Sequence, residues 1–345
     1  MSTPLRTSFC DLFGIDLPIV QAPIGSATCP ALAAAVSNAG GLGMLAGTWR
    51  DPDSLRRMVR ETRELTGRPF GVNLVLRWPP GERLELCLEE GVEVVSFVWG
   101  DPAPYVETIH AAGARLLHTV GSAEEATVAA EAGVDVVVAQ GWEAGGHVLG
   151  SVATLPLIPL AVDAVRPRPV LAAGGIADGR GLVAALALGA EGVMMGTRFL
   201  ASEEARVHPG YRDAVLRASE TDTVYSKLFD IGWPDAPHRT FRNTTVAAWE
   251  EAGRPAGGSR PGEGEVVASD PDGSPVPRYS DVIPLPGTTG DVEALALYMG
   301  QSAGQVRRIQ PAAEIVEEVR LEAEQTLRRL SGETPPKERP PGEPG

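Results

Sequence analysis

Cysteine is scarce in this sequence, which has 345 residues and three cysteines, Cys10, Cys29 and Cys87. They are widely spaced and form neither a Cys-x-x-Cys pair nor a set of four metal ligands, so neither a disulfide framework nor a metal site is expected. Such cysteine usage suits a reducing compartment. The sequence shows no charged segment followed by a short apolar signal-like run, and no apolar run of about 18 residues. We expect a cytoplasmic protein that does not span a membrane.

Positive charge is also scarce, because 30 Lys and Arg residues stand against 45 Asp and Glu residues and give a formal net charge of −15. A chain of this charge repels phosphate backbones, and no Lys/Arg cluster interleaved with aromatic residues offsets the repulsion. Nucleic-acid binding is therefore not expected. The sequence also lacks a His-Glu-x-x-His helix, a Ser/His/Asp order and clustered carboxylates, so it supports neither zinc chemistry nor a hydrolytic triad.

Short apolar runs alternate with stretches of helical length as far as about residue 200, which is the pattern of repeated βα units on a parallel sheet. The predicted strands are residues 18–23, 42–46, 70–75, 94–98, 115–119, 134–140, 170–173 and 192–195. Eight such units predict the α/β class and a closed (β/α)8 TIM barrel over residues 1–224. A doubly wound open sheet would use similar units, so closure is inferred from the number of strands.

The pattern changes after the barrel. Residues 225–310 have mixed patterning, and residues 253–277, rich in Gly, Pro and acidic side chains, are predicted to form a flexible insertion. Helical periodicity returns at residues 291–300 and again at residues 311–330, where an apolar face predicts a C-terminal helix that docks on the barrel. The proline-rich residues 331–345 are predicted to be a disordered tail.

Glycines lie at the ends of the seventh and eighth predicted strands, where barrels of this kind commonly bind phosphate. Gly174 and Gly175 end the seventh strand, and Gly196 and Thr197 follow the eighth. Glycine lets a phosphate approach backbone N–H groups, and the threonine hydroxyl adds a donor. One glycine could serve a tight turn alone, but two consecutive strand ends together favour a phosphate-bearing cofactor or substrate.

The loop after the sixth predicted strand carries a candidate acid–base residue. Gly141, Gly145 and Gly146 would let the backbone pass close to a planar ligand, and His147 follows them at the barrel mouth. An imidazole can gain or lose a proton near neutral pH. A lone histidine on a loop is more often a surface hydrogen-bonding residue, but its position in this glycine-rich strand end favours catalysis.

Polar residues end further strands. Asn73 ends the third strand, Gln21 precedes Ala22 and Pro23 at the end of the first, and His118 precedes Thr119 at the end of the fifth. Amide side chains both donate and accept, which suits the mixed edge of a flavin ring or a sugar, although they could equally join neighbouring loops. Three tryptophans could line an apolar pocket, with core packing expected for at least two: Trp142, Trp233 and Trp249.

Taken together, these residues resemble the nitronate monooxygenases, formerly called 2-nitropropane dioxygenases. The resemblance runs in order across about residues 9–230 and is carried by residues 18–25, 35–43, 70–73, 145–147, 174–176 and 195–199. It implies a TIM barrel that binds FMN, with a smaller, mostly helical C-terminal domain over the mouth at residues 225–310. His147 falls on the family's catalytic histidine. The FMN contacts that the resemblance implies are Ala22, Pro23, Asn73, Gln140, Gly146, Gly174, Gly175, Gly196 and Thr197.

In those enzymes a nitronate gives an electron to FMN and dioxygen takes it on, which yields a carbonyl compound and nitrite; a neutral nitroalkane first loses its α-proton to the histidine. This chain departs from many members at Thr119, where they carry lysine. FMN-dependent enoyl-acyl-carrier-protein reductases and NAD(P)H:quinone reductases share the same motifs, so the electron donor stays open. A flavin-free phosphate-binding barrel and a non-catalytic binding module are further alternatives. The oligomeric state also stays open, with a homodimer among the alternatives.

Overall fold

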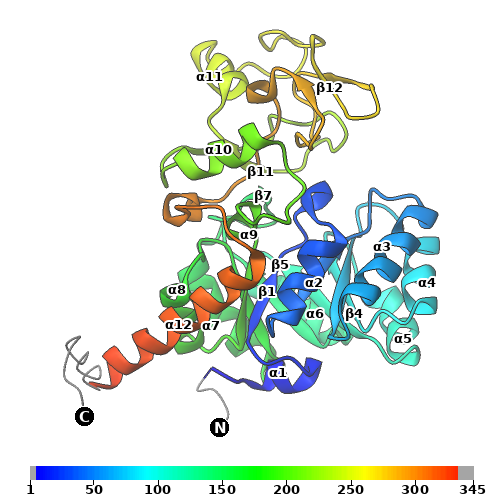
Figure 1. Ribbon diagram of the computed structural model, residues 1–345, viewed down its shortest axis with the longest axis vertical. Helices are drawn as coiled ribbons and strands as arrows, with labels where there is room; N and C mark the ends of the chain where they lie inside the picture. Colours follow the sequence, from blue (N-terminus) through cyan, green and yellow to red (C-terminus); the bar gives the residue numbers. More distant parts are fainter. Residues whose placement is uncertain (1–4, 333–345) are drawn as a thin grey trace, which may run out of the picture.

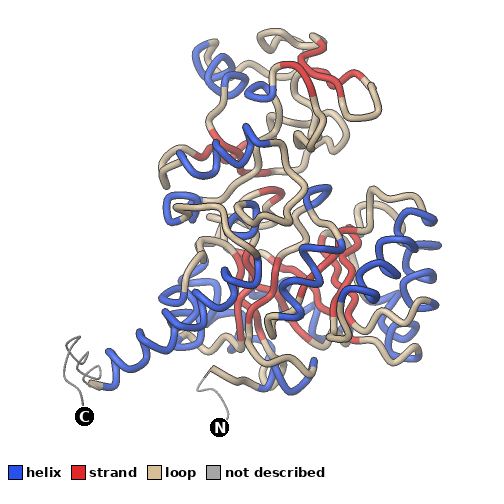
Figure 2. The backbone as a smooth tube through the Cα atoms, viewed as in Figure 1, coloured by secondary structure: helices blue, strands red, loops and turns tan. Residues whose placement is uncertain are grey.

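The computed structural model of the protein describes residues 5–332. Eight parallel strands form one sheet in the order β1-β9-β8-β6-β5-β4-β3-β2, and a parallel bridge between Val20 and Leu42 joins its two edge strands (Figures 1 and 2). The predicted closed barrel is therefore confirmed. The strands are β1 (Ile19–Gln21), β2 (Gly43–Ala46), β3 (Phe70–Val75), β4 (Val94–Val98), β5 (Arg115–Val120), β6 (Val136–Gln140), β8 (Val170–Ala173) and β9 (Gly192–Met195).

Helices cover the outside of the barrel because each βα unit returns its chain along the outer face of the sheet (Figure 1). Asp51, Ser122 and Asp178 begin three of these helices, and each side chain accepts a hydrogen bond from a backbone N–H in the first turn. These helices are α2 (Pro30–Asn38), α3 (Pro52–Leu65), α4 (Gly81–Glu89), α5 (Ala103–Ala111), α6 (Ala123–Ala132), α7 (Thr154–Val165), α8 (Gly179–Ala187) and α9 (Thr197–Leu200).

The barrel interior is filled by side chains and is blocked at its lower end. Helix α1 (Ser8–Phe13) lies below the strands and buries Phe9 and Phe13 in the same apolar cluster as Met44, Val138 and Leu171 from the strands (Figure 1). With that end closed, a ligand can reach the barrel only from the end at which the strands finish, as is usual in this fold.

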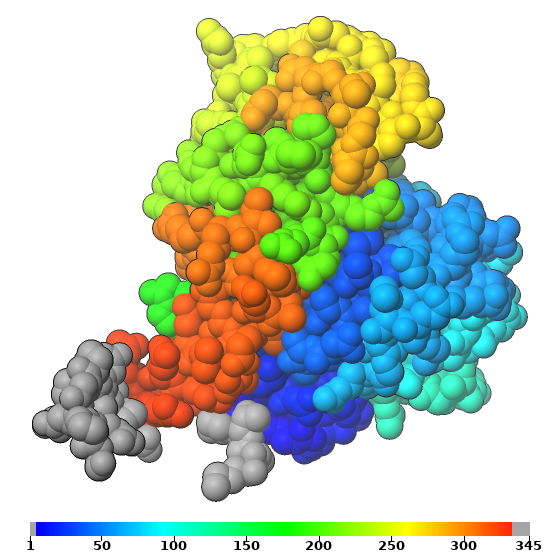
Figure 3. Space-filling model, viewed as in Figure 1, coloured from blue at the N-terminus to red at the C-terminus, as the bar shows by residue number. Residues whose placement is uncertain are grey.

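A smaller domain covers the open end of the barrel (Figures 1 and 3). It contains more strand than the sequence predicts, because two three-stranded sheets, β10-β11-β7 and β13-β12-β14, stand where a mostly helical domain is expected. Its elements are β7 (Gly146–His147), α10 (Pro209–Arg217), β10 (Thr223–Ser226), β11 (His238–Phe241), α11 (Thr244–Glu251), β12 (Val266–Ser269), β13 (Pro275–Pro277) and β14 (Thr289–Gly290), with the short 3-10 turns η2 (Val292–Ala294) and η3 (Gln301–Gln305). A further 3-10 turn, η1 (Gly25–Ala27), belongs to the barrel and follows β1.

Two segments of this domain differ from the sequence prediction for identifiable reasons. Within residues 253–277, residues 266–277 form the β12–β13 hairpin, and buried Arg260 fixes the chain before it through ion pairs with Asp230 and Glu263. Residues 291–300 are helical only at η2, since Leu295, Leu297 and Met299 alternate with a period of two and all are buried. The second segment therefore runs as extended chain beside β11.

Helix α12 (Ala312–Ser331) lies along the side of the barrel, where it packs against α8 and α2 (Figures 1 and 3). The approach to α8 is so close that a Cβ added at Gly179 would lie 2.2 Å from the backbone nitrogen of Ala323. Most of the predicted tail, residues 333–345, lies outside the described residues. None of the helices in residues 5–332 combines the length and the apolar character that a membrane crossing requires.

Candidate active site

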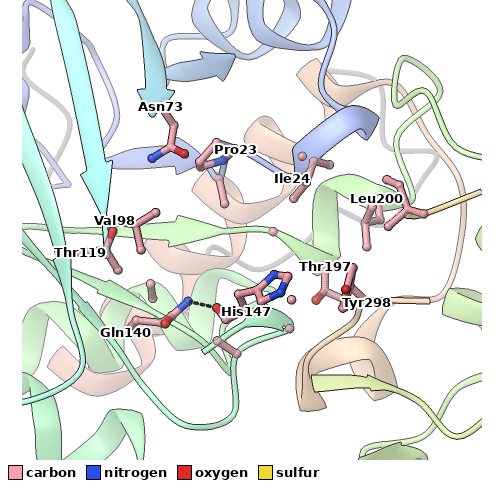
Figure 4. Close-up of a pocket in the computed structure, with 18 of the residues that line it drawn as sticks. Pro23, Ile24, Asn73, Val98, Thr119, Gln140, His147, Thr197, Leu200 and Tyr298 are labelled. Carbon is pink, nitrogen blue, oxygen red and sulfur yellow. Dashed lines mark hydrogen bonds between the residues drawn. The ribbon is translucent and has the colours of Figure 1, made fainter. Parts of the chain in front are cut away.

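A cavity of about 410 Å³ opens at the carboxyl ends of the barrel strands, beneath the smaller domain. Its wall includes every residue that the sequence predicts for catalysis or cofactor binding. These residues are Ala22, Pro23, Asn73, Gln140, Gly146, His147, Gly174, Gly175, Gly196 and Thr197. Figure 4 labels five of them, Pro23, Asn73, Gln140, His147 and Thr197. The structure thus brings together residues that lie as far apart in the sequence as the first and the last barrel strand.

Glycine backbone forms one side of this cavity. Gly174 and Gly175 follow β8 with φ angles of 95° and 72°, a conformation that favours glycine. At Gly174 a side chain is also excluded by space, since an added Cβ would lie 2.9 Å from the carbonyl oxygen of Gly141. Across the β9 end, Thr197 Oγ1 accepts a hydrogen bond of 2.9 Å from the Gly300 N–H, which leaves its hydroxyl hydrogen free to donate. This side can therefore offer a ligand several N–H and O–H donors.

His147 lies on β7, the two-residue strand that joins the barrel loop to the smaller domain by pairing with β11. Its Nε2 atom is buried and has no hydrogen-bond partner among the described residues. Burial and the neighbouring His238 lower the pKa of the His147 imidazole to about 3. The ring is therefore neutral at physiological pH, and His147 lines the cavity with a ring that makes no hydrogen bond to the described residues.

The amide side chains near the cavity have two roles: some hold neighbouring backbone segments in place, and some line the cavity wall. Gln140 donates from Nε2 to the His147 carbonyl oxygen over 3.1 Å (Figure 4) and accepts at Oε1 from the Leu149 N–H over 3.0 Å. Asn73 donates to the carbonyl oxygen of Ser96 over 3.1 Å and keeps its own amide oxygen free of protein partners. Gln21 does not line the cavity; its amide joins β1 to β2 instead, by accepting from the Met44 N–H over 3.1 Å.

Aromatic residues form the other side of the cavity, and most of them are not among the predicted site residues. Trp49, Trp99, Trp233 and Tyr298 all line it, whereas Trp142 and Trp249 lie elsewhere. Trp49 and Trp99 closely follow the ends of β2 and β4, so their strand-end positions could have identified them from the sequence. Of the three tryptophans that the sequence analysis considered for an apolar pocket, Trp233 alone lines this cavity, and no sequence signal indicated Tyr298, which comes from the smaller domain.

The charge of the cavity wall is negative. Among the described residues that line it there is no Lys or Arg, while Asp270 and Asp281 contribute carboxylates from the smaller domain. Burial raises the pKa of Asp281 to about 6. Thr119, at the position where the resembling family often carries lysine, also lines the cavity. Side chains therefore provide no cationic group for an anionic ligand, and only backbone N–H and hydroxyl groups can bind one.

Comparison with curated proteins places the chain among oxidoreductases. The nitronate monooxygenase family model matches residues 6–80 and 78–322. A Rhodococcus jostii protein named (3aS,4S,5R,7aS)-5-hydroxy-7a-methyl-1-oxo-octahydro-1H-indene-4-carboxyl-CoA dehydrogenase is 40% identical over 258 residues, 74% of this chain and 71% of its own. A probable nitronate monooxygenase of Staphylococcus saprophyticus is 36% identical over 274 residues, 65% of this chain and 76% of its own.

Two solved structures show the same architecture over almost the whole chain. FabK from Thermotoga maritima has a TM-score of 0.78 and 35% identity, covering 95% of this chain and 99% of its own. Nitroalkane oxidase from Streptomyces ansochromogenes has a TM-score of 0.75 and 30% identity, covering 94% and 100%. The match to the family model extends well beyond the barrel and includes the cavity and its covering domain. The chain is an oxidoreductase and belongs to the nitronate monooxygenase family.

Proposed function

We propose that this protein binds FMN in the cavity and oxidises nitroalkanes or their nitronates with dioxygen, giving a carbonyl compound and nitrite. The observation that carries the proposal is that a glycine-rich backbone wall and His147, whose ring has no hydrogen-bond partner among the described residues, line the same cavity at the barrel mouth. Pockets that combine an apolar wall with a few convergent polar groups are the usual sites of ligand binding.

The residues present fit FMN. Gly174, Gly175 and Gly196, with the Thr197 hydroxyl, offer the donors that a phosphate group needs at the ends of the last two strands. The free amide oxygen of Asn73 can accept from a ring N–H. When bound, FMN supplies the redox chemistry, and the protein contributes binding, orientation and proton transfer.

His147 would act as the acid–base group of this reaction. Its ring is neutral at physiological pH and makes no hydrogen bond to the described residues, so the imidazole can accept the α-proton of a bound nitroalkane. A neutral imidazole does not attract an anionic nitronate by charge, and the described wall of the cavity holds no Lys or Arg that could. We therefore expect the neutral nitroalkane to be the form that depends most on His147.

The proposal is tested by nitrite release and dioxygen consumption with 2-nitropropane and, separately, with propionate 3-nitronate. His147→Gln should lower turnover of the neutral nitroalkane by about 10²- to 10⁴-fold, as expected for loss of a general base, and turnover of the preformed nitronate by less. The flavin absorbance of both proteins gives the matched control for cofactor content. Wild-type protein that carries FMN and releases no nitrite from either compound would overturn the proposal.

A second candidate function is reduction or oxidation of an acyl thioester or a quinone with a nicotinamide as partner. It is favoured by the aromatic wall of Trp49, Trp99 and Trp233, which can pack against a quinone ring or an acyl chain. The CoA-thioester substrate in the name of the Rhodococcus relative points the same way. Oxidation of NADH or NADPH that depends on an enoyl thioester or a quinone would support this candidate.

A further inference from the structure

His147 lacks the contact that usually orients a catalytic histidine. Such a histidine commonly donates its second ring N–H to a carboxylate or a backbone carbonyl, which fixes the tautomer and the ring direction. Within residues 5–332 the structure shows no hydrogen bond to either ring nitrogen of His147. Something other than hydrogen bonding must therefore set the direction of this imidazole.

Three rings surround it instead, and all three belong to the smaller domain. Trp233 stacks on the imidazole with 4.0 Å between ring centroids and 24° between planes. His238 lies 5.6 Å away at 70°, and Tyr298 lies 5.4 Å away at 49°. The stacked ring covers one face of His147 and the two inclined rings limit its rotation, which is the geometry that aromatic pairs prefer.

The two inclined rings are themselves fixed. His238 Nδ1 donates to the Ala236 carbonyl oxygen over 2.9 Å, and its Nε2 accepts from the Phe229 N–H over 3.2 Å. Burial lowers the pKa of His238 to about 4, so this neighbour is neutral at physiological pH. Tyr298 donates from its hydroxyl to the Asp281 carbonyl oxygen over 3.3 Å, and burial raises its pKa. Neither ring adds charge beside His147.

Trp233 is held from the other side by the barrel. Trp78, Trp99 and Trp49, each from the loop after one of three consecutive strands, lie 5.0, 5.2 and 6.0 Å from it between ring centroids. Trp99 adopts a φ angle of +59°, a strained conformation for a large side chain that persists only where surrounding contacts hold it. Four of the six tryptophans of the chain thus meet at one point, and Trp233, 2% exposed, lies between the barrel loops and His147.

The conformation of the loop that carries Trp233 is also restricted. Gly232, immediately before it, has a φ angle of +110°, and an added Cβ there would lie 2.2 Å from Oδ1 of Asp281. Backbone hydrogen bonds from Ile231 to Tyr279 and from Asp281 to Ile231 fix the start of the loop. The positive φ angle and the contact with the Asp281 side chain both disfavour a side chain at residue 232, so glycine suits the turn that leads into Trp233.

We propose that Trp233 is a positioning residue for His147: stacked between the tryptophans of the barrel loops and the imidazole, it holds the ring direction and keeps water from its covered face. The catalytic part of this inference rests on the proposed role of His147 as the acid–base group. The structural part does not, because the direction and hydration of the imidazole can be measured without any substrate.

The test uses histidine-labelled protein carrying its flavin and follows each ring by NMR through a pH titration, with His147→Gln to assign the resonance. In the wild type the pKa of His147 should lie well below its ordinary value, since burial disfavours the charged ring. Trp233→Leu should raise this pKa by about one unit or more, because water then reaches the uncovered face. Trp249→Leu, the same change at a tryptophan of the smaller domain outside the cavity, should leave it unchanged.

Two further variants keep the test decisive if Trp233→Leu does not fold. Trp233→Phe retains a stacked ring and should leave the His147 titration near that of the wild type, whereas Trp233→Met fills the site without a ring and should raise the pKa. In the enzymatic reaction, loss of the ring at residue 233 should lower kcat by about tenfold or more with a smaller effect on KM, since misplacement of a reacting group acts on the chemical step. An unchanged His147 titration in folded Trp233→Leu or Trp233→Met would overturn the inference, whether or not nitronates prove to be substrates.

Discussion

Gln140 at the end of β6 holds the backbone that carries His147. Its side chain donates to the carbonyl oxygen of His147 over 3.1 Å and accepts from the N–H of Leu149 over 3.0 Å. A predicted cofactor contact thus also fixes the β7 segment on which the candidate catalytic residue lies.

Replacing Gln140 by Met removes both bonds at nearly constant volume. Two backbone groups are then left unsatisfied, so the free energy of unfolding should fall by about 1–3 kcal/mol, and amide hydrogen exchange at residues 147–149 should accelerate. Gln325→Met, the same change on the exposed surface of α12, is the control and should alter neither quantity. Unchanged exchange at residues 147–149 in Gln140→Met would show that the amide does not hold this segment.

Gly146, which lines the cavity, and Gly14, which does not, are matched positions for a test of cofactor binding. Both have positive φ angles, 73° and 65°, and a Cβ added to either meets nothing within 4 Å, but only Gly146 lines the cavity. Alanine at either position should cost a similar free energy of unfolding, about 1 kcal/mol, from backbone strain. Only Gly146→Ala should weaken FMN binding, measured by fluorescence titration of the apoprotein. Equal FMN affinity in the two variants would argue against FMN binding along this loop.

Arg198 and Glu318 join the end of β9 to α12. The guanidinium is 7% exposed in its side chain, donates to the carboxylate over 2.9 Å, and leaves Nη1 without a partner among the described residues. Removal of the carboxylate leaves a buried charge uncompensated, so Glu318→Leu should cost about 3 kcal/mol or more, whereas the double change Arg198→Met with Glu318→Leu should cost less. Urea unfolding measures both, and a double variant less stable than Glu318→Leu would contradict this account.

Three histidines, two buried and one partly buried, should make the fold sensitive to acid. Burial lowers the pKa of His118 and His238 to about 4 and that of His147 to about 3, below the ordinary value near 6.5 of the unfolded chain. Between about pH 6.5 and pH 4 the unfolded state therefore binds protons that the folded state does not. Stability falls with falling pH across this window, by about 1.4 kcal/mol per pH unit for each histidine.

His118, which does not line the cavity, provides the check. The loss of unfolding free energy between pH 7.5 and pH 5.5 should be about 1.4 kcal/mol smaller in His118→Asn than in the wild type, because one proton-binding group is removed from the unfolded state. The comparison of two pH values within one variant cancels the cost of the substitution itself. An equal loss in both proteins would mean that His118 titrates normally in the folded state.

The barrel and its ligand-binding end could be predicted from the sequence because both depend on local signals. Strands buried on both faces appear as short apolar runs, and the glycines, Asn73 and His147 stand at their ends, where the fold brings strand ends together. The direction of His147 could not be predicted. It depends on β7, a strand of two residues that has no pattern of its own and forms only by pairing with β11.

The smaller domain was less predictable for the same reason. Its strands are two to four residues long, and buried Arg260 stabilises a segment whose composition is typical of flexible chain. The tryptophan cluster arises from three separate barrel loops and one loop of the smaller domain. Convergence of this kind is a property of tertiary structure, and no spacing in the sequence indicates it.

The most direct test of the proposed function is anaerobic mixing of the flavin-loaded protein with propionate 3-nitronate, and separately with NADH and NADPH, while the flavin absorbance is followed. The account predicts rapid loss of the oxidised flavin absorbance with the nitronate alone. Reduction by a nicotinamide and not by the nitronate would contradict it in favour of a reductase, and protein that shows no flavin absorbance after addition of FMN would contradict the cofactor itself.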